Sequence, residues 1–434
     1  MAAPRDEVRR RLDAVWRIEA GRITGALARM LRDVGLAEEM AQDALVSALE
    51  HWPRDGVPNN PGAWLMAAAK NKALDRLRQL KLHESKQQEL GADADARGDH
   101  VVPDFVDALD AAREDEIGDD LLRLIFTACH PVCPHEQRAA LTLKLLGGLS
   151  TAEIARAYML PEPTVAQRIV RAKRTLASAK VPFELPSSRN GGGALDERLA
   201  SVLEVVYLIF NEGYSATAGS DWMRTPLCDE ALRLARMLQG LYTGRGPGER
   251  EVHGLAALLE IQASRLAARV NAQGEPILLL EQDRSLWDRL LIGRGMAALA
   301  RAAVLPGQPG PYELQAAIAA CHARAAQAAD TDWARIVALY DILLAGLPTP
   351  VVRLNRAVAV GMAQGAAAAL PLVEALLAEP ALKRYHLLHA VLGDLLFKLG
   401  RTAEARAAFE QAAAMTANER EKALMLQRAR STPS

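Results

Sequence analysis

One short stretch of the sequence carries residues suited to contact with a nucleic acid. It runs from Leu149 to Leu176 and holds two helical segments separated by the breaker MLPEP. In the second segment Val165, Ile169 and Ala172 share one face, at spacings of four and three. The polar residues of that segment point elsewhere, and they are Thr164, Gln167, Arg168, Arg171 and Arg174. Guanidinium groups hold phosphates and pair with guanine, so this arrangement predicts a DNA-contacting helix.

The break between the two segments follows helix-turn-helix rules. Ser150 suits the N-cap of the first helix, and Pro161 closes that helix because proline cannot continue a helix interior. Pro163 can stand in the first turn of the second helix. Seven Lys or Arg outnumber two acids between positions 144 and 180. Such a positive excess indicates nucleic-acid binding, and the plainer alternative is a solvated face on a helical hairpin.

A second basic segment runs from Ala63 to about Lys86. Six Lys or Arg in it outweigh Asp75 and Glu84, and Asn71 lies on the same helix face as Asp75. A basic helix with an asparagine and a nearby tryptophan, here Trp64, can hold phosphates and contact unpaired bases. The plainer alternative is a core tryptophan beneath a solvated face.

The helix before this segment has an acidic face. AEEMAQDALVSALEHWP places its apolar residues on an inner stripe. The residues predicted on its outer face are Glu38, Glu39, Gln42, Asp43 and Glu50. Viewed as an isolated helix, this face is simply solvated surface.

The bulk composition predicts a helical protein of several domains. Half of the 434 residues are hydrophobic but only 4% are aromatic, and alanine and leucine dominate. Between residues 89 and 120 twelve acids face two arginines, which predicts an extended acidic linker. Four scattered cysteines favour a reducing compartment. No secretion signal or membrane-spanning run is recognisable, so we expect a soluble cytoplasmic protein.

No segment predicts a metal site, a cofactor or catalysis. CHPVCPH, from Cys129 to His135, contains zinc-ligand residue types but lacks a second, distant ligand pair. Glu212, Asp283 and Asp288 have no nucleophile, metal cluster or phosphate loop beside them. Helix caps and ion pairs between helices explain these carboxylates, so we expect no enzyme.

The last 250 residues read as helix after helix, with one clear internal repeat. Counted from His386, small and aromatic residues stand where a tetratricopeptide repeat has them, at Gly393, Gly400, Ala405, Phe409 and Ala412. A fainter copy begins near Thr349, and a degenerate helix precedes it from Trp333 to Tyr340. The pattern predicts a helical solenoid.

Taken together, these segments resemble the sigma-70 family of RNA polymerase sigma factors, and within it the extracytoplasmic-function group. AEEMAQDALVSALEHW is similar to the region 2 helix that docks on the polymerase. NPGAWLMAAAKNKALDRLRQ resembles the part of region 2 that melts and reads the -10 element. The stretch from DDLLRLIFTACHP to QRIVRAKRTL resembles region 4, which reads the -35 element. The resemblance covers residues 12 to 181, and the C-terminal half resembles a branch whose tetratricopeptide extension regulates the factor.

The resemblance implies a role for each group of residues. Core RNA polymerase would meet Glu38, Glu39 and Asp43. The -10 strand would lie near Trp64, Lys70, Asn71, Arg76 and Arg78. The -35 duplex would meet the polar face that ends at Arg174. The implied partners are core polymerase, promoter DNA, and a regulatory protein or ligand on the C-terminal helices, without a membrane or cofactor.

The expected protein is all-α, with a region 2 domain at 5–86, an acidic linker at 87–118, a region 4 domain at 119–182 and a helical repeat domain at 195–430. The alternative is a one-component helix-turn-helix transcriptional regulator whose repeats bind a ligand or protein. A third class is a repeat scaffold with an incidental helix-turn-helix. The basic segment between Trp64 and Arg78 separates the first two, because a plain regulator needs no strand-opening module.

Overall fold

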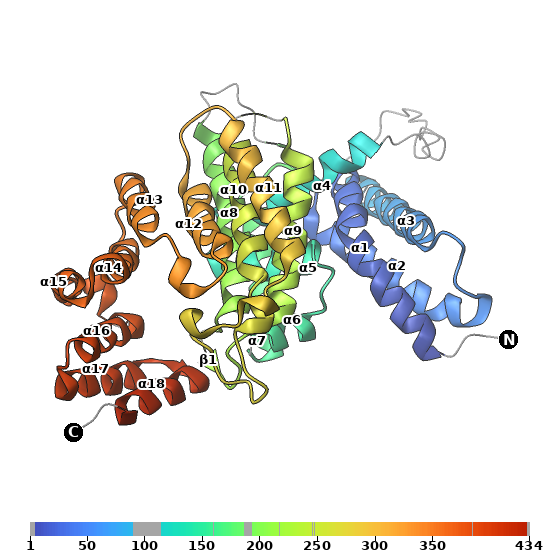
Figure 1. The fold of residues 1–434 in the computed structure, drawn as a ribbon. Coiled ribbons are helices and arrows are strands. Elements are labelled where there is room, and N and C mark those ends of the chain that lie inside the picture. Colours follow the sequence, from blue (N-terminus) through green and yellow to red (C-terminus); the bar gives the residue numbers. More distant parts are fainter. Residues whose placement is uncertain are drawn as a thin grey trace. The chain divides into compact units, whose positions relative to one another are not determined.

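The chain folds almost entirely into helices (Figure 1). The computed structural model describes residues 5–89, 114–158, 160–185, 193–216, 218–244, 246, 248–383 and 385–431. Their contacts divide the chain into a first unit, Met1–Arg156 with Leu160–Val205, and a second unit, Ala157–Met159 with Val206–Ser434. The predicted all-α class is confirmed. Most of the acidic linker expected at 87–118 lies outside the described residues.

The first unit is built around a three-helix core. Its helices are α1 (Arg5–Leu31), α2 (Val34–Asp55), α3 (Pro61–Glu89), α4 (Glu114–Ala128), α5 (His135–Leu145), α6 (Thr151–Tyr158), α7 (Glu162–Ser178) and the first part of α8 (Gly193–Tyr214). Helices α1 to α3 bury one apolar stripe each, and Leu12, Ile23, Trp52 and Leu65 are fully buried where the stripes meet.

Glycine lets α4 approach α1 closely. A Cβ added at Gly25 would lie 3.0 Å from the carbonyl oxygen of Asp120, at the start of the buried part of α4. The carboxylate of Asp120 also pairs with Arg29 of α1 at 3.1 Å and with Arg123 at 2.8 Å. The helices that follow the linker are therefore joined to α1 by a small-residue contact and by ion pairs.

The second unit contains the remaining helices and two short strands. Its α-helices after α8 are α9 (Thr225–Tyr242), α10 (Glu249–Ala263), α11 (Arg289–Val304), α12 (Pro311–Arg324), α13 (Trp333–Gly346), α14 (Pro350–Gln364), α15 (Ala366–Leu376), α16 (His386–Lys398), α17 (Thr402–Met415) and α18 (Glu419–Ser431). Its 3-10 turns are η2 (Leu266–Ala268), η3 (Leu279–Glu281), η4 (Arg284–Leu286), η5 (Ala328–Asp330) and η6 (Pro380–Leu382). Strand β1 (Ala218–Gly219) pairs in parallel with β2 (Ala417–Asn418).

Helix α10 is buried along almost its whole length, because α9, α11 and α12 pack around it. From α13 to α18 each helix packs on the next, as in a chain of helical hairpins. The buried Asn418 ties the end of this array back to the segment after α8, since its amide donates to the carbonyls of Ala216 and Asp221 at 3.0 and 2.9 Å.

The small residue predicted at position 393 has a packing role. A Cβ on Gly393 of α16 would lie 2.9 Å from ring atoms of Phe409 on α17, and Phe409 is fully buried. Ala405 and Ala412 are buried on the same helix as Phe409. The close approach inferred for this helix pair is confirmed.

Alanine substitutions at two glycines of α11 should change the stability of the second unit in opposite directions. A Cβ at Gly295 would meet Cγ1 of Ile261 at 2.5 Å and the carbonyl oxygen of Ala257 at 3.0 Å, whereas Gly293 faces open space. We expect Gly295→Ala to destabilise the contact between α10 and α11 by about 1 to 3 kcal/mol. Gly293→Ala should stabilise α11 by roughly 0.5 to 1 kcal/mol, because alanine loses less backbone entropy in a helix.

Hydrogen exchange of the α10 and α11 amides, resolved by mass spectrometry, measures both changes locally. Faster exchange in Gly295→Ala and slower exchange in Gly293→Ala is the expected pair. Equal effects of the two substitutions would contradict the packing described here.

Candidate nucleic-acid interface

The helix-turn-helix begins with a reciprocal cap. The amide of Glu153 donates to Oγ of Ser150 at 3.1 Å, and the amide of Ser150 donates to Oε2 of Glu153 at 2.8 Å. This capping box starts α6. Pro161 stands at the N-cap of α7 and Pro163 lies in its first turn. The predicted cap and the predicted use of both prolines are confirmed.

Helix α7 has two distinct faces. Val165, Ile169, Ala172 and Leu176 are buried and dock it on the rest of the first unit. Gln167, Arg171 and Arg174 are exposed, while Thr164 and Arg168 are half-buried. No carboxylate among the described residues forms an ion pair with Arg168, Arg171 or Arg174. The predicted orientation of the helix is therefore confirmed, and it presents three guanidinium groups without protein counter-charges.

A different side of α7 is neutralised by α2. Nζ of Lys173 lies 2.5 Å from Oε2 of Glu38, and Nζ of Lys144 on α5 lies 3.5 Å from Oε1 of the same carboxylate. The sequence predicts Glu38 on a solvated face beside Glu39 and Asp43, but Glu38 is only 8% exposed. That placement is wrong for Glu38, because two lysines from distant helices cover it. Glu39 and Asp43 are exposed as predicted.

The basic segment predicted near the N-terminus lies on α3. Trp64 is half-buried and packs edge-on against Trp52, with ring centroids 5.5 Å apart. Asn71 and Arg78 are exposed, and Lys70 and Arg76 are half-buried. Nη1 of Arg78 lies 3.2 Å from Oδ1 of Asp75. Trp64 therefore contributes to the core from one side, while the polar residues further along α3 stay accessible.

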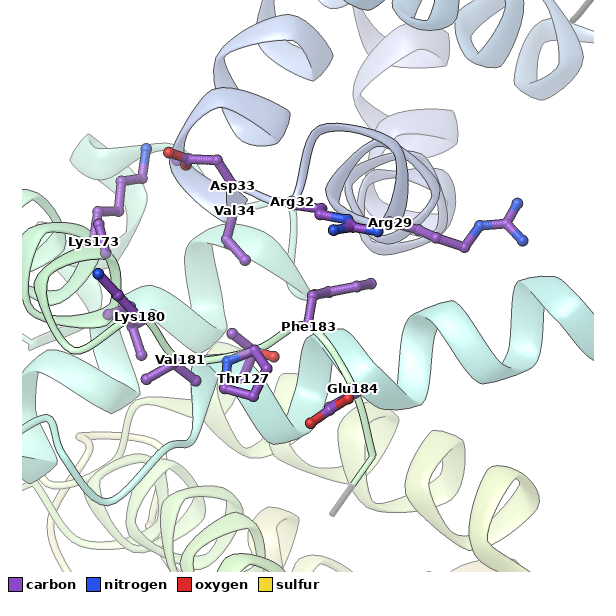
Figure 2. A pocket seen from close by; sticks show the side chains of 14 residues that line it. Arg29, Arg32, Asp33, Val34, Thr127, Lys173, Lys180, Val181, Phe183 and Glu184 are labelled. Atoms are coloured by element: carbon purple, nitrogen blue, oxygen red, sulfur yellow. The ribbon is translucent and has the colours of Figure 1, made fainter. Parts of the chain in front are cut away.

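A cavity separates α7 from the turn between α1 and α2 (Figure 2). It has a volume of about 660 Å³, and its wall includes Arg32 and Asp33 of that turn and Lys173 of α7. Phe183, just after α7, also lines the cavity and packs against the core of α1 to α3. The two halves of the first unit, α1 to α3 and α4 to α7, therefore meet through ion pairs as well as through apolar contacts. A Cβ added at Gly21 of α1 would lie 2.9 Å from Cδ1 of Leu121 on α4.

The CHPVCPH segment, which the sequence leaves without a role, receives the first part of α8. Oγ of Ser201 donates to the carbonyl of Cys129 at 2.5 Å, and Nη2 of Arg198 donates to the carbonyl of Phe126 at 2.7 Å. The buried Arg138 donates to Ser201 and lies 3.3 Å from Glu204. Sequence reasoning missed this contact, because nothing in residues 198–204 marks them as partners of a segment 63 to 72 positions earlier.

The two thiols of this segment are buried. Burial raises the pKa of Cys129 to about 11, and Sγ of Cys133 contacts the carbonyl of Ala172 at 3.7 Å. Burial, with Arg198 and Arg138 nearby, lowers the pKa of His130 to about 4. Within the described part of the chain, no group of three or more His, Cys, Asp or Glu is placed to hold a metal ion.

The three carboxylates considered for catalysis have structural partners. Glu212 pairs with Arg224. Asp283 caps η4 by accepting from the amide of Ser285 at 2.8 Å, and Asp288 caps α11 by accepting from the amide of Leu290 at 2.8 Å. The prediction of caps and ion pairs is confirmed.

Comparisons with known proteins match two family models to the first unit. The model described as sigma-70 region 2 matches residues 16–82, and the model described as sigma-70 region 4 matches residues 127–176. Residues 198–303 match a family of unknown function, DUF6596. The first match covers most of α3, the second covers most of α7, and the third begins in α8.

Whole-chain similarity extends to a bacterial relative without an assigned function. The chain is 44% identical over 400 residues to an uncharacterized protein of Rhizobium meliloti. This alignment covers 92% of this chain and 90% of that protein. It is 30% identical over 159 residues to the ECF RNA polymerase sigma factor SigK of Mycobacterium ulcerans, covering 36% of this chain and 78% of that protein. The SigK of Mycobacterium bovis is 29% identical over the same length. No solved structure matches the chain.

In the part of the chain that the structure describes, no helix is long and apolar enough to cross a membrane.

Proposed function

Because the chain belongs to the extracytoplasmic-function RNA polymerase sigma factors, we propose that it holds a promoter at two points, with α7 on the -35 duplex and α3 on the -10 strand. A sigma factor binds core RNA polymerase and directs it to promoter DNA, and families of sigma factors are not enzymes. The observation that supports the two-point grip best is the exposed face of α7. Its three guanidinium groups lack protein counter-charges, and its opposite face is anchored in the first unit.

The proposed -35 contacts are Thr164, Gln167, Arg168, Arg171 and Arg174. Exposed arginine and glutamine suit base edges in the major groove, and the half-buried Arg168 suits a phosphate at the groove wall. The length of α7, from Glu162 to Ser178, allows its N-terminal residues to enter the groove while its C-terminal residues follow the backbone.

The proposed -10 contacts are Trp64, Lys70, Asn71, Arg76 and Arg78. Asn71 can hydrogen-bond a base edge once the strands separate, and the cations can hold the displaced backbone. Trp64 has less freedom, because its ring already packs on Trp52. We assign Trp64 a supporting role that holds the start of α3 in place.

We place the polymerase contact on α2, at Glu38, Glu39 and Asp43. Glu39 and Asp43 are exposed, but Glu38 is paired with Lys144 and Lys173. Polymerase can reach Glu38 only if those ion pairs break. The closed first unit is therefore proposed to open on binding, and the cavity beside α7 leaves fewer contacts to break at that place.

We propose that the helices after the first unit regulate the factor, with domain limits of 5–86 for region 2, 87–118 for the linker, 119–182 for region 4 and 195–430 for the regulatory domain. The stepwise packing of α13 to α18 and the contact of Gly393 with Phe409 support a tetratricopeptide-like array there. The region 2 match argues against a one-component regulator, which needs no strand-opening module.

Initiation reconstituted with core polymerase tests the sigma function and the role of α3 together. The full chain should allow core polymerase to initiate from a promoter selected from random duplex DNA. We expect Asn71→Ala with Arg76→Ala to lower initiation by roughly 10- to 100-fold on closed duplex. On a template whose -10 region is already unpaired, the same variant should recover most of its activity, because strand separation no longer limits it.

A matched control removes the same amide and guanidinium groups elsewhere, as Gln427→Ala with Arg430→Ala on the exposed side of α18. It should initiate like the wild type on both templates. Failure of the wild-type chain to bind core polymerase at low salt would refute the two-point grip. Equal loss by the α3 variant on both templates would refute only the strand-opening role.

The α11 glycine variants test regulation in the same assay. Gly295→Ala disturbs the second unit and leaves the proposed DNA and polymerase contacts intact, so it should change transcript yield while core binding stays unchanged. Gly293→Ala should match the wild type. Unchanged yield in both variants would count against a regulatory second unit.

A further inference from the structure

A cavity of about 310 Å³ lies within the second unit, lined mainly by residues of five helices. Helices α8, α10, α12, α13 and α14 all contribute residues to its wall. Tyr207 of α8 donates to Oε1 of Gln315 on α12 at 3.2 Å, and this bond closes one side. The volume falls within the range of sites for small organic ligands.

Aromatic rings form much of the wall. Tyr207, Phe210 and Tyr214 come from successive turns of α8, and Tyr340 comes from α13. The rings of Phe210 and Tyr214 stack with centroids 5.4 Å apart. Burial raises the pKa of Tyr340 to about 12, so its hydroxyl stays protonated at neutral pH. Such walls suit a flat, apolar ligand body.

The wall is positively charged. Arg265 lines the cavity, donates to the hydroxyl of Tyr214 and lies with its guanidinium carbon 5.6 Å from the ring centroid of Trp287. Behind it, Arg269 is 5% exposed and Arg284 is 6% exposed, and both donate to backbone carbonyls. None of these three arginines forms an ion pair with a carboxylate of the described residues. Glu421 and Asp330 attract Arg269 and Arg284 only from beyond ion-pair distance. Cations without a directly paired carboxylate favour an anion in the cavity.

Polar atoms of the wall also lack partners. Nδ1 of His322 has no hydrogen-bond partner among the described residues, although the residue is only 8% exposed. Oε1 of Gln262 and Nε of Arg265 are likewise buried and unpartnered. Burial, followed by the charges of Arg265 and Arg284, lowers the pKa of His322 to about 4, so its ring is neutral at pH 7. Unpaired buried polar groups are costly, and a ligand that satisfies them gains that free energy.

We propose that this cavity binds a small aromatic carboxylate that also carries a hydroxyl group. The carboxylate pairs with Arg265, the ring lies between the tyrosines and Phe210, and the hydroxyl bonds to Gln262 or His322. An ammonium group is disfavoured, because Arg265 lines the site and no carboxylate does. The effect of this ligand on transcription rests on the proposed regulatory role, but its binding does not.

Isothermal titration of the full chain with 4-hydroxybenzoate tests the site. Benzoate removes the hydroxyl, 4-hydroxybenzamide removes the charge, and inorganic phosphate removes the ring. Free tyrosine adds an ammonium group to a hydroxylated aromatic carboxylate. We expect 4-hydroxybenzoate to bind most tightly and benzoate more weakly, with free tyrosine, the amide and phosphate weaker still. Binding of phosphate alone, or of the amide as tightly as the acid, would overturn the proposed ligand class.

Arg265→Gln should weaken binding of 4-hydroxybenzoate by roughly 10- to 100-fold, because a charged hydrogen bond is lost. Arg294→Gln, an exposed arginine of α11, is the matched control and should bind like the wild type. Since Arg265 also holds Tyr214, a second variant leaves it in place. Ala319→Leu fills the cavity from α12 and should likewise remove binding.

Each outcome decides between the proposals. No binding by the wild type, or equal binding by all variants, refutes the site and leaves the sigma function untouched. Binding that is lost in Arg265→Gln and Ala319→Leu supports the site. If bound 4-hydroxybenzoate then leaves initiation unchanged, the site stands and regulation of initiation by this ligand is refuted.

Discussion

Replacing Arg168, Arg171 and Arg174 by alanine should weaken promoter binding of the holoenzyme by about 3 kcal/mol, which is roughly 150-fold. Each arginine contributes about 1 kcal/mol or more through a phosphate or a base edge. None of the three pairs with a carboxylate of the described residues, so their removal breaks no ion pair within the protein. The loss should therefore appear in DNA affinity and leave the stability of the first unit nearly unchanged.

The dependence on salt separates phosphate contacts from base contacts. Each lost phosphate contact lowers the slope of log affinity against log salt by about 0.9. A base-reading arginine instead changes the preferred sequence at one position. Binding by single variants, measured on a panel of promoter variants at several salt concentrations, assigns Arg168, Arg171 and Arg174 individually.

The control for this triple variant removes three arginines outside α7 and so changes the net charge by the same amount. Arg294, Arg335 and Arg430 are exposed in the second unit, and their joint replacement by alanine should leave promoter affinity close to that of the wild type. If both triple variants weaken binding equally, the effect is one of net charge and the assignment of α7 fails.

Local patterns in the sequence predicted local structure well. Ser150 and Glu153 stand three positions apart in the order of a capping box, and both reciprocal bonds form. Gly393 and Phe409 belong to one repeat, so their contact follows from a known helix-pair geometry. The apolar spacing of Val165, Ile169 and Ala172 identified the docking face of α7 because helical periodicity acts within a few turns.

Contacts between distant segments could not be predicted in this way. Glu38 has the pattern of a surface residue, and only the fold brings Lys144 and Lys173 to it. The hydrogen bond from Ser201 to the carbonyl of Cys129 connects distant segments that share no periodicity. The same is true of the segments that line the cavity at Arg265. Helical periodicity says which side of a helix is apolar, but not which helix will cover a polar side.

A second large effect is expected at Glu38, whose ion pairs join α2 to α5 and α7 and so help to hold the two halves of the first unit together. Lys144→Met with Lys173→Met leaves the carboxylate of Glu38 buried without a cation, at a cost of roughly 3 kcal/mol to the closed form. Opening hydrates Glu38 and relieves that cost. If polymerase binds only the open form, apparent affinity rises in proportion to the open fraction, by up to roughly 150-fold.

Two measurements check this expectation. Core polymerase affinity should rise in the double lysine variant, and energy transfer between dyes at positions 50 and 178 should fall because α2 and α7 separate. The control Lys180→Met with Lys422→Met removes two exposed lysines and should change neither.

Glu38→Gln removes the carboxylate at the other end of the same ion pairs. It also loosens the closed form, but it removes the carboxylate assigned to polymerase, so affinity should fall below that of the double lysine variant. If both variants raise the affinity for core polymerase equally, Glu38 only stabilises the closed form. The polymerase contact then rests on Glu39 and Asp43. If neither variant changes energy transfer, the closed contact does not depend on Glu38, and opening must be governed by the approach of α4 to α1 at Gly25.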